Sequence, residues 1–265
     1  MSTLYFPQLA AGSLAQYPVT RQWSKPAIIN TLQGGSTVLM TRVAPARLSW
    51  KLAYTGLSES EWGALQSLFT AVEGRFGTFT FVDPTDNLLS WSEDVTAAAW
   101  TKDPLLQVAG GIPDPLGGPA AWQLTNGAQA PQQLTQSLAG PSSHQYCFSI
   151  YLRTDSPCIV NLIRAAASNS AREPVAVGSN WIRVLTSGSL GGQDDGVHFG
   201  VELAAGATVF AFGPQVEAQP CAGPYKPKAD RSGVYTKSRF DQDTLTQTAD
   251  AVSQYSTTIQ VTSSY

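Results

Sequence analysis

Large apolar residues occupy every second position over residues 48–54, which is the period of a strand that buries one face. Residues 78–82, Thr-Phe-Thr-Phe-Val, are rich in β-branched and aromatic side chains, which also favour a strand. Both segments are therefore predicted to be strands. The alternating apolar series of the first consists of Leu48, Trp50, Leu52 and Tyr54.

Between these two strands the apolar period changes to that of a helix. Ser58 and Glu61 have the spacing of a capping box, in which each side chain bonds the backbone amide of the other. Gly74 stands where a left-handed residue would end the helix. One main helix is therefore predicted between Ser58 and Gly74, with its apolar face packed on a sheet. That face consists of Trp62, Leu65, Leu68, Phe69 and Val72.

The middle of the chain consists of short apolar runs separated by Gly, Pro, Ser and Asn clusters, with almost no helical period. Strands at this spacing predict a β-sandwich. The clearest predicted strands are residues 146–153, 158–164, 181–187, 198–203 and 207–212.

The last part of the chain returns to the style of the first, with strands predicted at residues 234–240 and 257–261. Neither end alone has enough apolar surface for a stable core, so we expect the final strand to pair with the first segment. The predicted fold class is mainly β: a discontinuous, β-rich α+β domain with one main helix, interrupted by an inserted β-sandwich of the jelly-roll type. The predicted domains are residues 1–87 with 228–265, and residues 88–227.

Composition and charge narrow the classes of function. Charged residues make up 13% of the 265 residues, about half the usual share, while 23 Gly and 17 Pro suit a turn-rich β protein. The formal charge is −3 and no run of Lys or Arg occurs, so nucleic-acid binding is not expected. No apolar stretch approaches the roughly 20 residues that span a bilayer, so membrane insertion is not expected. The start lacks the parts of a signal peptide, and we expect cytoplasmic synthesis without export.

The cysteines and histidines do not indicate a metal centre. Cys147, Cys158 and Cys221 are an odd number without CxxC spacing, so we expect buried free thiols instead of disulfides or zinc ligands. His144 and His198 are too few and too far apart to predict a metal site. No metal is therefore predicted from spacing.

The motifs of hydrolytic enzymes are missing from the sequence. It has no nucleophile elbow, no zinc-protease helix motif and no phosphate-binding loop, and no pair of carboxylates has a clear catalytic context. Asp194 and Asp195 lie near His198 in the sequence, but their Gly-rich surroundings favour a polar turn. We therefore expect no enzymatic activity.

A carbohydrate site needs an aromatic platform for the sugar ring and planar polar groups for the hydroxyls. Strand alternation places Tyr151 and Arg153 on the outer side of one predicted strand, and His198 and Glu202 on the outer side of another. These four residues are predicted to share one sheet face and to form the carbohydrate-binding site. The alternative is an ordinary solvated face or a contact between subunits.

The tryptophans of the middle segment are candidates for either the core or the aromatic platform. Trp100 follows a loop and is predicted to plug the core. Trp181 alternates with Arg183 and belongs either to the outer face or to the core, while Trp91 and Trp122 have no predicted place.

Motifs at the two ends of the chain form an ordered set. They are Phe6-Pro7-x-Leu9-x-x-Gly12, Gln16-Tyr17-Pro18, Tyr54-x-Gly56-Leu57-Ser58-x-x-Glu61, Phe69-x-x-x-x-Gly74-Arg75-x-x-x-Phe79-x-Phe81-x-Asp83-Pro84 and Arg239-Phe240-x-x-Asp243-x-Leu245. As a set they resemble the distal tail and minor tail proteins of long-tailed bacteriophages. Members of that family form rings, commonly hexamers, between the tail tube and the tail hub.

A second set of motifs lies in the middle segment. They are Asn87-Leu88-Leu89, Trp100-Thr101, Asp114-Pro115-x-Gly117-Gly118, Phe148-Ser149-x-Tyr151-x-Arg153, Trp181-x-Arg183-Val184 and Phe212-Gly213-Pro214-Gln215-Val216-Glu217 ahead of Tyr225. This set resembles jelly-roll carbohydrate-binding-like modules. Such modules often hold a structural calcium ion near their first and last strands, and the resemblance implies Asp86, Asn87 and Glu217 as its oxygen ligands. No other cofactor is implied.

Together the resemblances imply a non-enzymatic structural protein of a phage tail tip or baseplate, assembled in the host cytoplasm and located in the virion. Its expected partners are copies of itself in a hexameric ring, the tail tube and hub proteins, and a host surface polysaccharide bound by the sandwich. Two alternatives stay open: the insertion only grips neighbouring tail subunits, or the chain is part of a polysaccharide-degrading enzyme. Roughly the first 45 residues are expected to form an arm that becomes ordered on a neighbouring subunit.

Overall fold

The computed structural model describes residues 3–25, 27–41 and 46–264. The described chain is mainly β, as predicted, and forms two compact units. The sheet unit comprises Met1–Pro7, Ala15–Phe81 and Tyr235–Tyr265, and the sandwich unit comprises Gln8–Leu14 and Val82–Val234.

The limits of the two units differ from the predicted domain limits. The sandwich unit extends from Val82 to Val234, beyond the predicted range of 88–227, and also takes in Gln8–Leu14. The Gln8 side chain explains the second difference, because it donates to the Gln145 carbonyl at 3.0 Å and accepts from the Gln145 amide at 2.6 Å. A short N-terminal segment is thereby tied to the sandwich.

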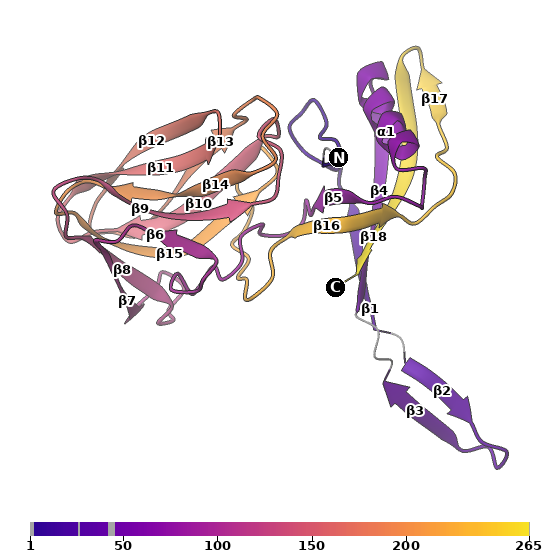
Figure 1. The fold of residues 1–265 in the computed structure, drawn as a ribbon, viewed down its shortest axis with the longest axis horizontal. Helices are drawn as coiled ribbons and strands as arrows, with labels where there is room; N and C mark the ends of the chain where they lie inside the picture. The colour runs from indigo at the N-terminus through magenta and orange to yellow at the C-terminus, as the bar shows by residue number, and fades with distance from the viewer. Residues whose placement is uncertain (1–2, 26, 42–45, 265) are drawn as a thin grey trace. The chain divides into compact units, whose positions relative to one another are not determined.

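The main sheet of the sheet unit has the strand order β1-β4-β18-β16-β5, and β17 also pairs with β18. The final strand lies antiparallel to β4, with Ile259 opposite Leu52 and Val261 opposite Trp50. The prediction that the last strand pairs with the first segment is therefore confirmed (Figure 1). The elements are β1 (Val19–Ser24), β4 (Arg47–Leu57), α1 (Glu59–Ala71), β5 (Phe79–Val82), β16 (Val234–Phe240), β17 (Thr248–Ala251) and β18 (Gln254–Ser264).

The alternating series in β4 builds the core of this unit. Leu48, Trp50, Leu52 and Tyr54 are all buried, as their period predicts. Aromatic rings from distant strands meet there: the Trp50 centroid lies 4.8 Å from that of Phe81. Burial of such rings stabilises the sheet unit.

The helix α1 lies within the predicted range and begins at the predicted cap. The Ser58 side chain accepts from the Glu61 amide, and the Glu61 carboxylate accepts from the Ser58 amide at 2.9 Å, so the capping box is confirmed. Gly74 is left-handed as predicted, with a φ of +61°, but the first left-handed residue after the helix is Glu73, with a φ of +53°. The Glu73 amide donates to the Thr70 carbonyl at 3.1 Å and the Gly74 amide to the Phe69 carbonyl at 2.9 Å, so the two residues end the helix together. Within the described residues, no helix has the length and apolar content needed to cross a bilayer.

A separate two-stranded sheet follows β1. It consists of β2 (Ala27–Thr31) and β3 (Thr37–Thr41), paired antiparallel as a hairpin. Several of its large apolar side chains are exposed, Leu39 by 70% and Ile29 by 64%. This hairpin falls within the segment that was predicted to be an arm.

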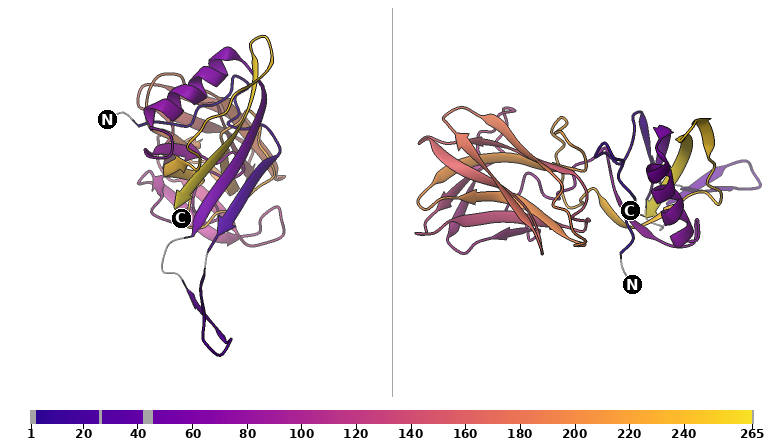
Figure 2. Two further views of the ribbon diagram at one scale, coloured as in Figure 1. Left: turned by 90° about the vertical axis from the view of Figure 1, so that its right-hand side faces the viewer. Right: turned by 90° about the horizontal axis from the view of Figure 1, so that it is seen from above.

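The sandwich unit consists of two five-stranded antiparallel sheets. Their strand orders are β13-β10-β15-β8-β7 and β12-β11-β14-β9-β6, and Figure 2 shows the strands in two layers. The strands are β6 (Trp100–Lys102), β7 (Leu106–Ile112), β8 (Ala121–Asn126), β9 (Gln132–Leu138), β10 (Tyr146–Arg153), β11 (Cys158–Ala166), β12 (Ser170–Val177), β13 (Ile182–Gly188), β14 (Val197–Leu203) and β15 (Thr208–Glu217).

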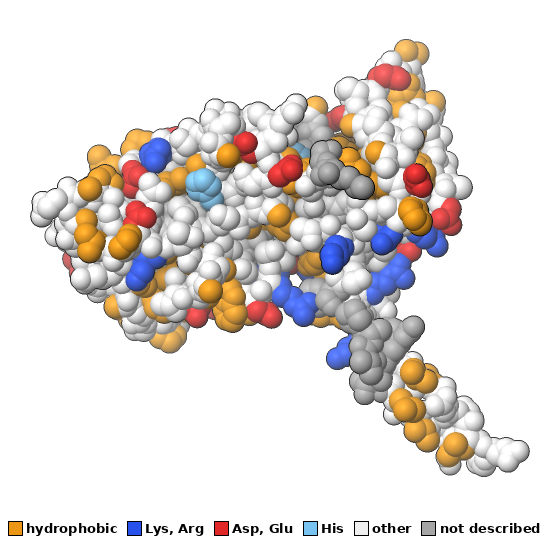
Figure 3. All heavy atoms as spheres, viewed as in Figure 1, with side chains coloured by type: hydrophobic (Ala, Val, Ile, Leu, Met, Phe, Trp, Pro, Cys, Tyr) orange, Lys and Arg blue, Asp and Glu red, His pale blue; other side chains and the backbone are white. Residues whose placement is uncertain are grey.

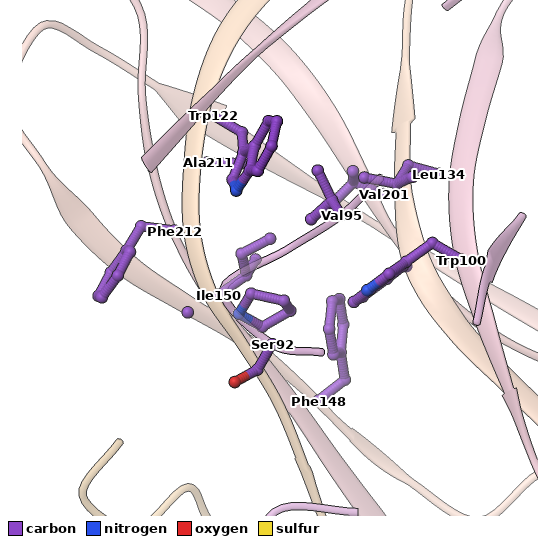
Figure 4. Close-up of a pocket in the computed structure, with 13 residues that line it drawn as sticks. Ser92, Val95, Trp100, Trp122, Leu134, Phe148, Ile150, Val201, Ala211 and Phe212 are labelled. Atoms are coloured by element: carbon purple, nitrogen blue, oxygen red, sulfur yellow. The ribbon is translucent and has the colours of Figure 1, made fainter. Parts of the chain in front are cut away.

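The space between these sheets is apolar, and Trp100 lies within it. Trp100 is 8% exposed and donates its indole N–H to the Trp91 carbonyl at 3.1 Å, so its predicted role as a core plug is confirmed. Figure 4 shows Trp100 and Trp122 around a small pocket that is also lined by Phe148 and Ile150. Because this lining is almost entirely hydrocarbon, we interpret the pocket as part of the core.

Candidate functional site

The four predicted sugar-binding residues lie on two different sheets. Tyr151 and Arg153 are in β10, whereas His198 and Glu202 are in β14 of the opposite sheet. Their side chains do point outward, but the outer faces of a sandwich look in opposite directions. The prediction of one shared face is therefore wrong, because alternation fixes which side of a strand faces out and not which sheet the strand joins.

Tyr151 and Arg153 belong to a cluster that we call the aromatic–arginine face. The pairing of β10 with β13 and β15 brings together residues distant in the sequence: Tyr151 lies opposite Arg183 and Phe212, and Arg153 lies opposite Phe210. Trp181, directly before β13, completes the group next to Arg153. The aromatic–arginine face consists of Tyr151, Arg153, Trp181, Arg183 and Phe210.

The arginines of this face are stacked on rings. The Arg153 guanidinium carbon lies 3.9 Å from the Phe210 ring centroid and 5.6 Å from that of Trp181. The Arg183 guanidinium carbon lies 5.4 Å from the Tyr151 ring centroid. Stacking on a ring orients a planar guanidinium, whose N–H groups at the edge of the plane can donate to hydroxyl or carboxylate oxygens.

The two arginines differ in their polar contacts. Arg183 donates to the Gly223 carbonyl at 2.6 Å and to the Ser149 hydroxyl at 2.9 Å, so it fixes a loop on the sheet. Arg153 contacts Asp155 at 2.9 Å, and the Asp155 side chain is 76% exposed. Because that partner is exposed to solvent, Arg153 is the arginine better suited to exchange its contact for a ligand.

Part of this sheet is covered by the segment of residues 219–228. The Gly223 amide and the Lys226 ammonium both bond the Glu217 carboxylate at 2.7 Å, and the Tyr225 ring packs on Phe212 at 5.2 Å. The end that holds Arg153 and Phe210 lies next to a hollow lined by residues 154–158 and 204–208. A ligand on the aromatic–arginine face can therefore approach from that end.

The opposite sheet carries a polar face, which consists of Gln133, Asn161, Arg172, His198 and Glu202. Glu202 is its centre, since it accepts from Gln133 at 2.7 Å, from Asn161 at 2.9 Å and from Arg172 at 3.4 Å. Burial raises the pKa of Glu202, but these donors and the charge of Arg172 lower it more, and the net pKa lies below its ordinary value. Burial and the charge of Arg172 also lower the pKa of His198.

This face offers hydrogen bonds without a stacking platform. The outward positions of its central strands β9, β11 and β14 hold amide, hydroxyl, imidazole, carboxylate and aliphatic groups. The contacts of Glu202 connect strands β9, β11, β12 and β14, so they stabilise the sheet across its width. A sugar ring would find donors and acceptors at these positions, but no Trp, Tyr or Phe ring on which to stack.

The residues implied for calcium do not fit the ion. Asp86 faces the Lys228 ammonium at 2.8 Å, and Glu217 faces Lys226. The side-chain Oδ1 of Asn87 accepts from two backbone amides, those of Leu89 and Val216. These oxygens are held by donors and neutralised by ammonium groups, which is the opposite of what a cation site requires. Among the described residues, no group of three or more His, Cys, Asp or Glu side chains is placed to hold a metal.

The cysteines and Asp194, which the sequence analysis also considered, do not form a site. The cysteines are free thiols as predicted, but only Cys147 is buried; Cys158 is half-buried and Cys221 is exposed. Asp194 accepts from the Ser168 amide at 3.1 Å and from its hydroxyl, and these bonds lower the pKa of Asp194. It thereby ties two loops of the sandwich together.

The sequence does contain a signal for the aromatic–arginine face. Tyr151-x-Arg153 and Trp181-x-Arg183 are two aromatic-x-arginine pairs. In neighbouring antiparallel strands, such pairs place each arginine beside the ring of the other strand, as Tyr151 and Arg183 show. Phe210 carries no such signal, because only the pairing of β15 with β10 brings it under Arg153.

Several solved structures are similar to this chain, although no protein-family model and no curated protein matches it. The CBM22-1 xylan-binding domain of Paenibacillus barcinonensis Xyn10C is 18% identical with a TM-score of 0.43, over 52% of this chain and 97% of that one. TmCBM61 in complex with β-1,4-galactotriose is 15% identical with a TM-score of 0.39, over 50% and 98%. The enzymatically active domain of bacteriophage CBA120 tailspike protein 4 is 12% identical with a TM-score of 0.38, over 52% and 22%.

Proposed function

We propose that this chain is a structural component of a phage tail tip whose sandwich unit binds a polysaccharide on the host surface. In this proposal, copies of the chain form a ring, commonly a hexamer, between the tail tube and hub proteins. The ordered motifs at the two chain ends support the tail assignment. The aromatic–arginine face supports the binding role.

The observation that carries the binding role is the Arg153 guanidinium held on Phe210 and beside Trp181. Trp181 and Tyr151 are half-buried, so part of each ring stays open to solvent. A pyranose can place its C–H groups against such a ring while its hydroxyls accept from the oriented guanidinium. Arg153 and Trp181 are the residues to which we assign these two tasks.

The proposed role is binding without cleavage. Glycoside hydrolysis needs a carboxylic acid whose pKa is raised so that it can donate a proton. Glu202, the outward carboxylate at the centre of the polar face, has a lowered pKa and is ionised at neutral pH. It is therefore suited to hold neighbouring donors and unsuited to act as a general acid.

Weak single sites are sufficient in a ring. Sites on one rigid assembly act together through their effective concentration, which raises the overall affinity by roughly 10²- to 10⁴-fold. We therefore expect reversible attachment to a repetitive polysaccharide and only weak binding of short oligosaccharides.

The test is a glycan array probed with the full chain, followed by affinity measurements on the best polysaccharide. Trp181→Ala and Arg153→Ala should each weaken binding at least about tenfold, which corresponds to roughly 1.4 kcal/mol of lost contact. His198→Ala, on the polar face, is the matched control and should leave the affinity unchanged. Loss of binding in the control alone would move the site to the polar face. No binding by the multimeric chain would favour the purely structural role of the insertion.

A further inference from the structure

The sheet that carries the aromatic–arginine face holds little negative charge. Its strands β7, β8, β10, β13 and β15 contain two arginines, Arg153 and Arg183, and a single carboxylate, that of Glu217. The Glu217 side chain is 1% exposed and lies 2.7 Å from the Lys226 ammonium, which neutralises it. The two guanidinium groups are therefore the charges that this sheet offers to a ligand.

The charges of the two arginines are balanced to different extents. Arg183 donates to two neutral oxygens, those of Gly223 and Ser149, and no described carboxylate forms an ion pair with it. Arg153 does have a carboxylate partner, Asp155, whose side chain is 76% exposed. Because an exposed ion pair contributes at most about 1 kcal/mol, a carboxylate from a ligand can replace that of Asp155 with little loss.

The Arg153 guanidinium suits a carboxylate better than a hydroxyl. Its contact with Asp155, at 2.9 Å, places a carboxylate oxygen on a guanidinium that is stacked on Phe210. The guanidinium fork matches the two oxygens of a carboxylate, and such pairs are often bidentate. A hydroxyl of a neutral sugar meets only part of the fork and brings no opposite charge.

The hollow beside Arg153 leaves room for the sugar ring that would carry such a carboxylate. It has a volume of about 400 Å³, which lies within the roughly 300–1,000 Å³ of small-molecule sites. Asp155 and Phe210 both line it. A sugar whose carboxylate takes the place of Asp155 can therefore lie in the hollow.

The overall charge of the chain does not favour an acidic ligand. The formal charge is −3, and in Figure 3 acidic and basic side chains are scattered over the visible surface of the sandwich unit, without a patch of either sign. General attraction of a polyanion needs a large field of positive sign. Any preference for an acidic ligand must therefore come from close contact with Arg153 and Arg183.

We propose that the aromatic–arginine face selects an acidic polysaccharide, one that contains uronic acids, and that a sugar carboxylate replaces Asp155 on the Arg153 guanidinium. This inference rests on the polysaccharide binding proposed above and names the chemical class of the polymer. Arg183, whose charge is not paired with a described carboxylate, attracts the acidic chain along the same face. Asp155 holds Arg153 in the free protein and competes with the ligand.

The first test compares polymers that differ only in charge. Binding of the full chain is measured by biolayer interferometry to polygalacturonate, alginate and hyaluronan, and to the carboxyl-reduced form of each, in which a primary alcohol replaces the carboxylate. At least one acidic polymer should bind at least about tenfold tighter than its reduced form. The difference should shrink at about 1 M salt, where the Debye length is roughly 3 Å.

The possible results separate this inference from the proposed function. Equal binding to both forms of every polymer, or binding to neutral glycans alone on the array, overturns the acidic class and leaves polysaccharide binding in place. Absence of binding to every polymer and to every glycan on the array rejects both.

The second test removes the competing carboxylate. Asp155→Asn should raise the affinity for the acidic polymer about three- to tenfold and leave that for the reduced form within about twofold. Arg153→Gln should abolish the preference for the acidic form, and Arg153→Lys should keep only part of it, because lysine has the charge without the fork. These affinities are measured as in the first test.

Glu173→Gln is the matched control, because it makes the same change of charge at an exposed position of β12, in the opposite sheet. It should bind both forms like the parent chain. An equal gain in affinity from this variant would mean that net charge, and not the Arg153 site, sets the preference. An Arg153→Gln variant that keeps the full preference would likewise overturn the assignment.

Discussion

The two outer faces of the sandwich arise from the same strand alternation but hold charge in different ways. On the aromatic–arginine face, the Arg153 cation rests on the Phe210 ring, which directs it without using its N–H groups. On the polar face, the Glu202 anion is surrounded by donors from three other strands. Arg153 bonds the exposed carboxylate of Asp155, a contact that it can exchange for a ligand, whereas Glu202 accepts from three side chains of its own sheet. The first face therefore suits binding and the second suits cohesion of the sheet.

The largest effect is expected from removing the Phe210 ring on which Arg153 is stacked. Phe210 is 8% exposed, so Phe210→Ala should cost the sandwich unit about 3–4 kcal/mol of unfolding free energy. Phe210→Leu keeps most of the burial and should cost about 1 kcal/mol, while still weakening glycan binding because the stack is lost. The free energy of unfolding is measured in urea, with hydrogen exchange of the backbone amides as the probe of the sandwich strands. Equal glycan affinity in the leucine variant and the parent would mean that the stack does not orient Arg153.

The next largest effect is the loss of stability in acid, which should depend on the buried His144 and not on His198. Burial lowers the pKa of His144 from 6.5 to about 4, so the folded chain keeps it neutral while the unfolded chain takes up a proton. The resulting stability is complete above pH 6.5 and falls between pH 6.5 and 4, by about 3 kcal/mol in total. His144→Leu should remove most of this acid sensitivity, whereas His198→Leu, on the polar face, should retain it. Unfolding free energies at several pH values check this, and equal acid loss in the parent and the His144 variant would contradict it.

The smallest predicted effect tests the cohesion assigned to the polar face. Glu202→Gln removes the ion pair with Arg172 and places an amide N–H₂ group among side chains that are themselves donors. The variant should therefore lose about 1–2 kcal/mol of unfolding free energy. Because the pKa of Glu202 is lowered, its contribution is present above the ordinary pKa and disappears as the pH falls through the folded value. Parent and variant should therefore converge in strong acid, as followed by chemical unfolding. A constant difference down to pH 2 (about two units below an ordinary Glu pKa) would show that packing, and not charge, is lost.

Local patterns predicted the elements of the sheet unit well. The capping box, the period of two in β4 and the left-handed backbone at Gly74 depend on residues that are close in the sequence. The pairing of the last strand with the first segment followed from apolar surface that neither end could bury alone. Strands β7, β8, β9 and β12 were not among the clearest predicted ones, since Gly, Gln, Thr and Ser obscure their alternation.

The candidate site was predicted less well, for a definite reason. The outward direction of Tyr151, Arg153, His198 and Glu202 follows from alternation, but their division between two sheets depends on which distant strands pair. Phe210 reaches Arg153 across 57 residues of chain (210 − 153) through the β15 ladder alone. The calcium expectation came from a resemblance, and the lysines that neutralise Asp86 and Glu217 could be found only in the folded chain.

By itself, the sequence determined the class of the protein: mainly β, with one capped helix, strands whose apolar side is readable, and an uncharged segment at residues 27–41. Only the tertiary structure decided which strands share a sheet, which charges are stacked or saturated, and that the uncharged segment is a hairpin with both sides exposed. The physical reason is the distance in sequence over which each interaction acts. Alternation and capping act between residues a few positions apart, whereas a binding face is assembled by hydrogen-bond ladders between strands far apart in the chain.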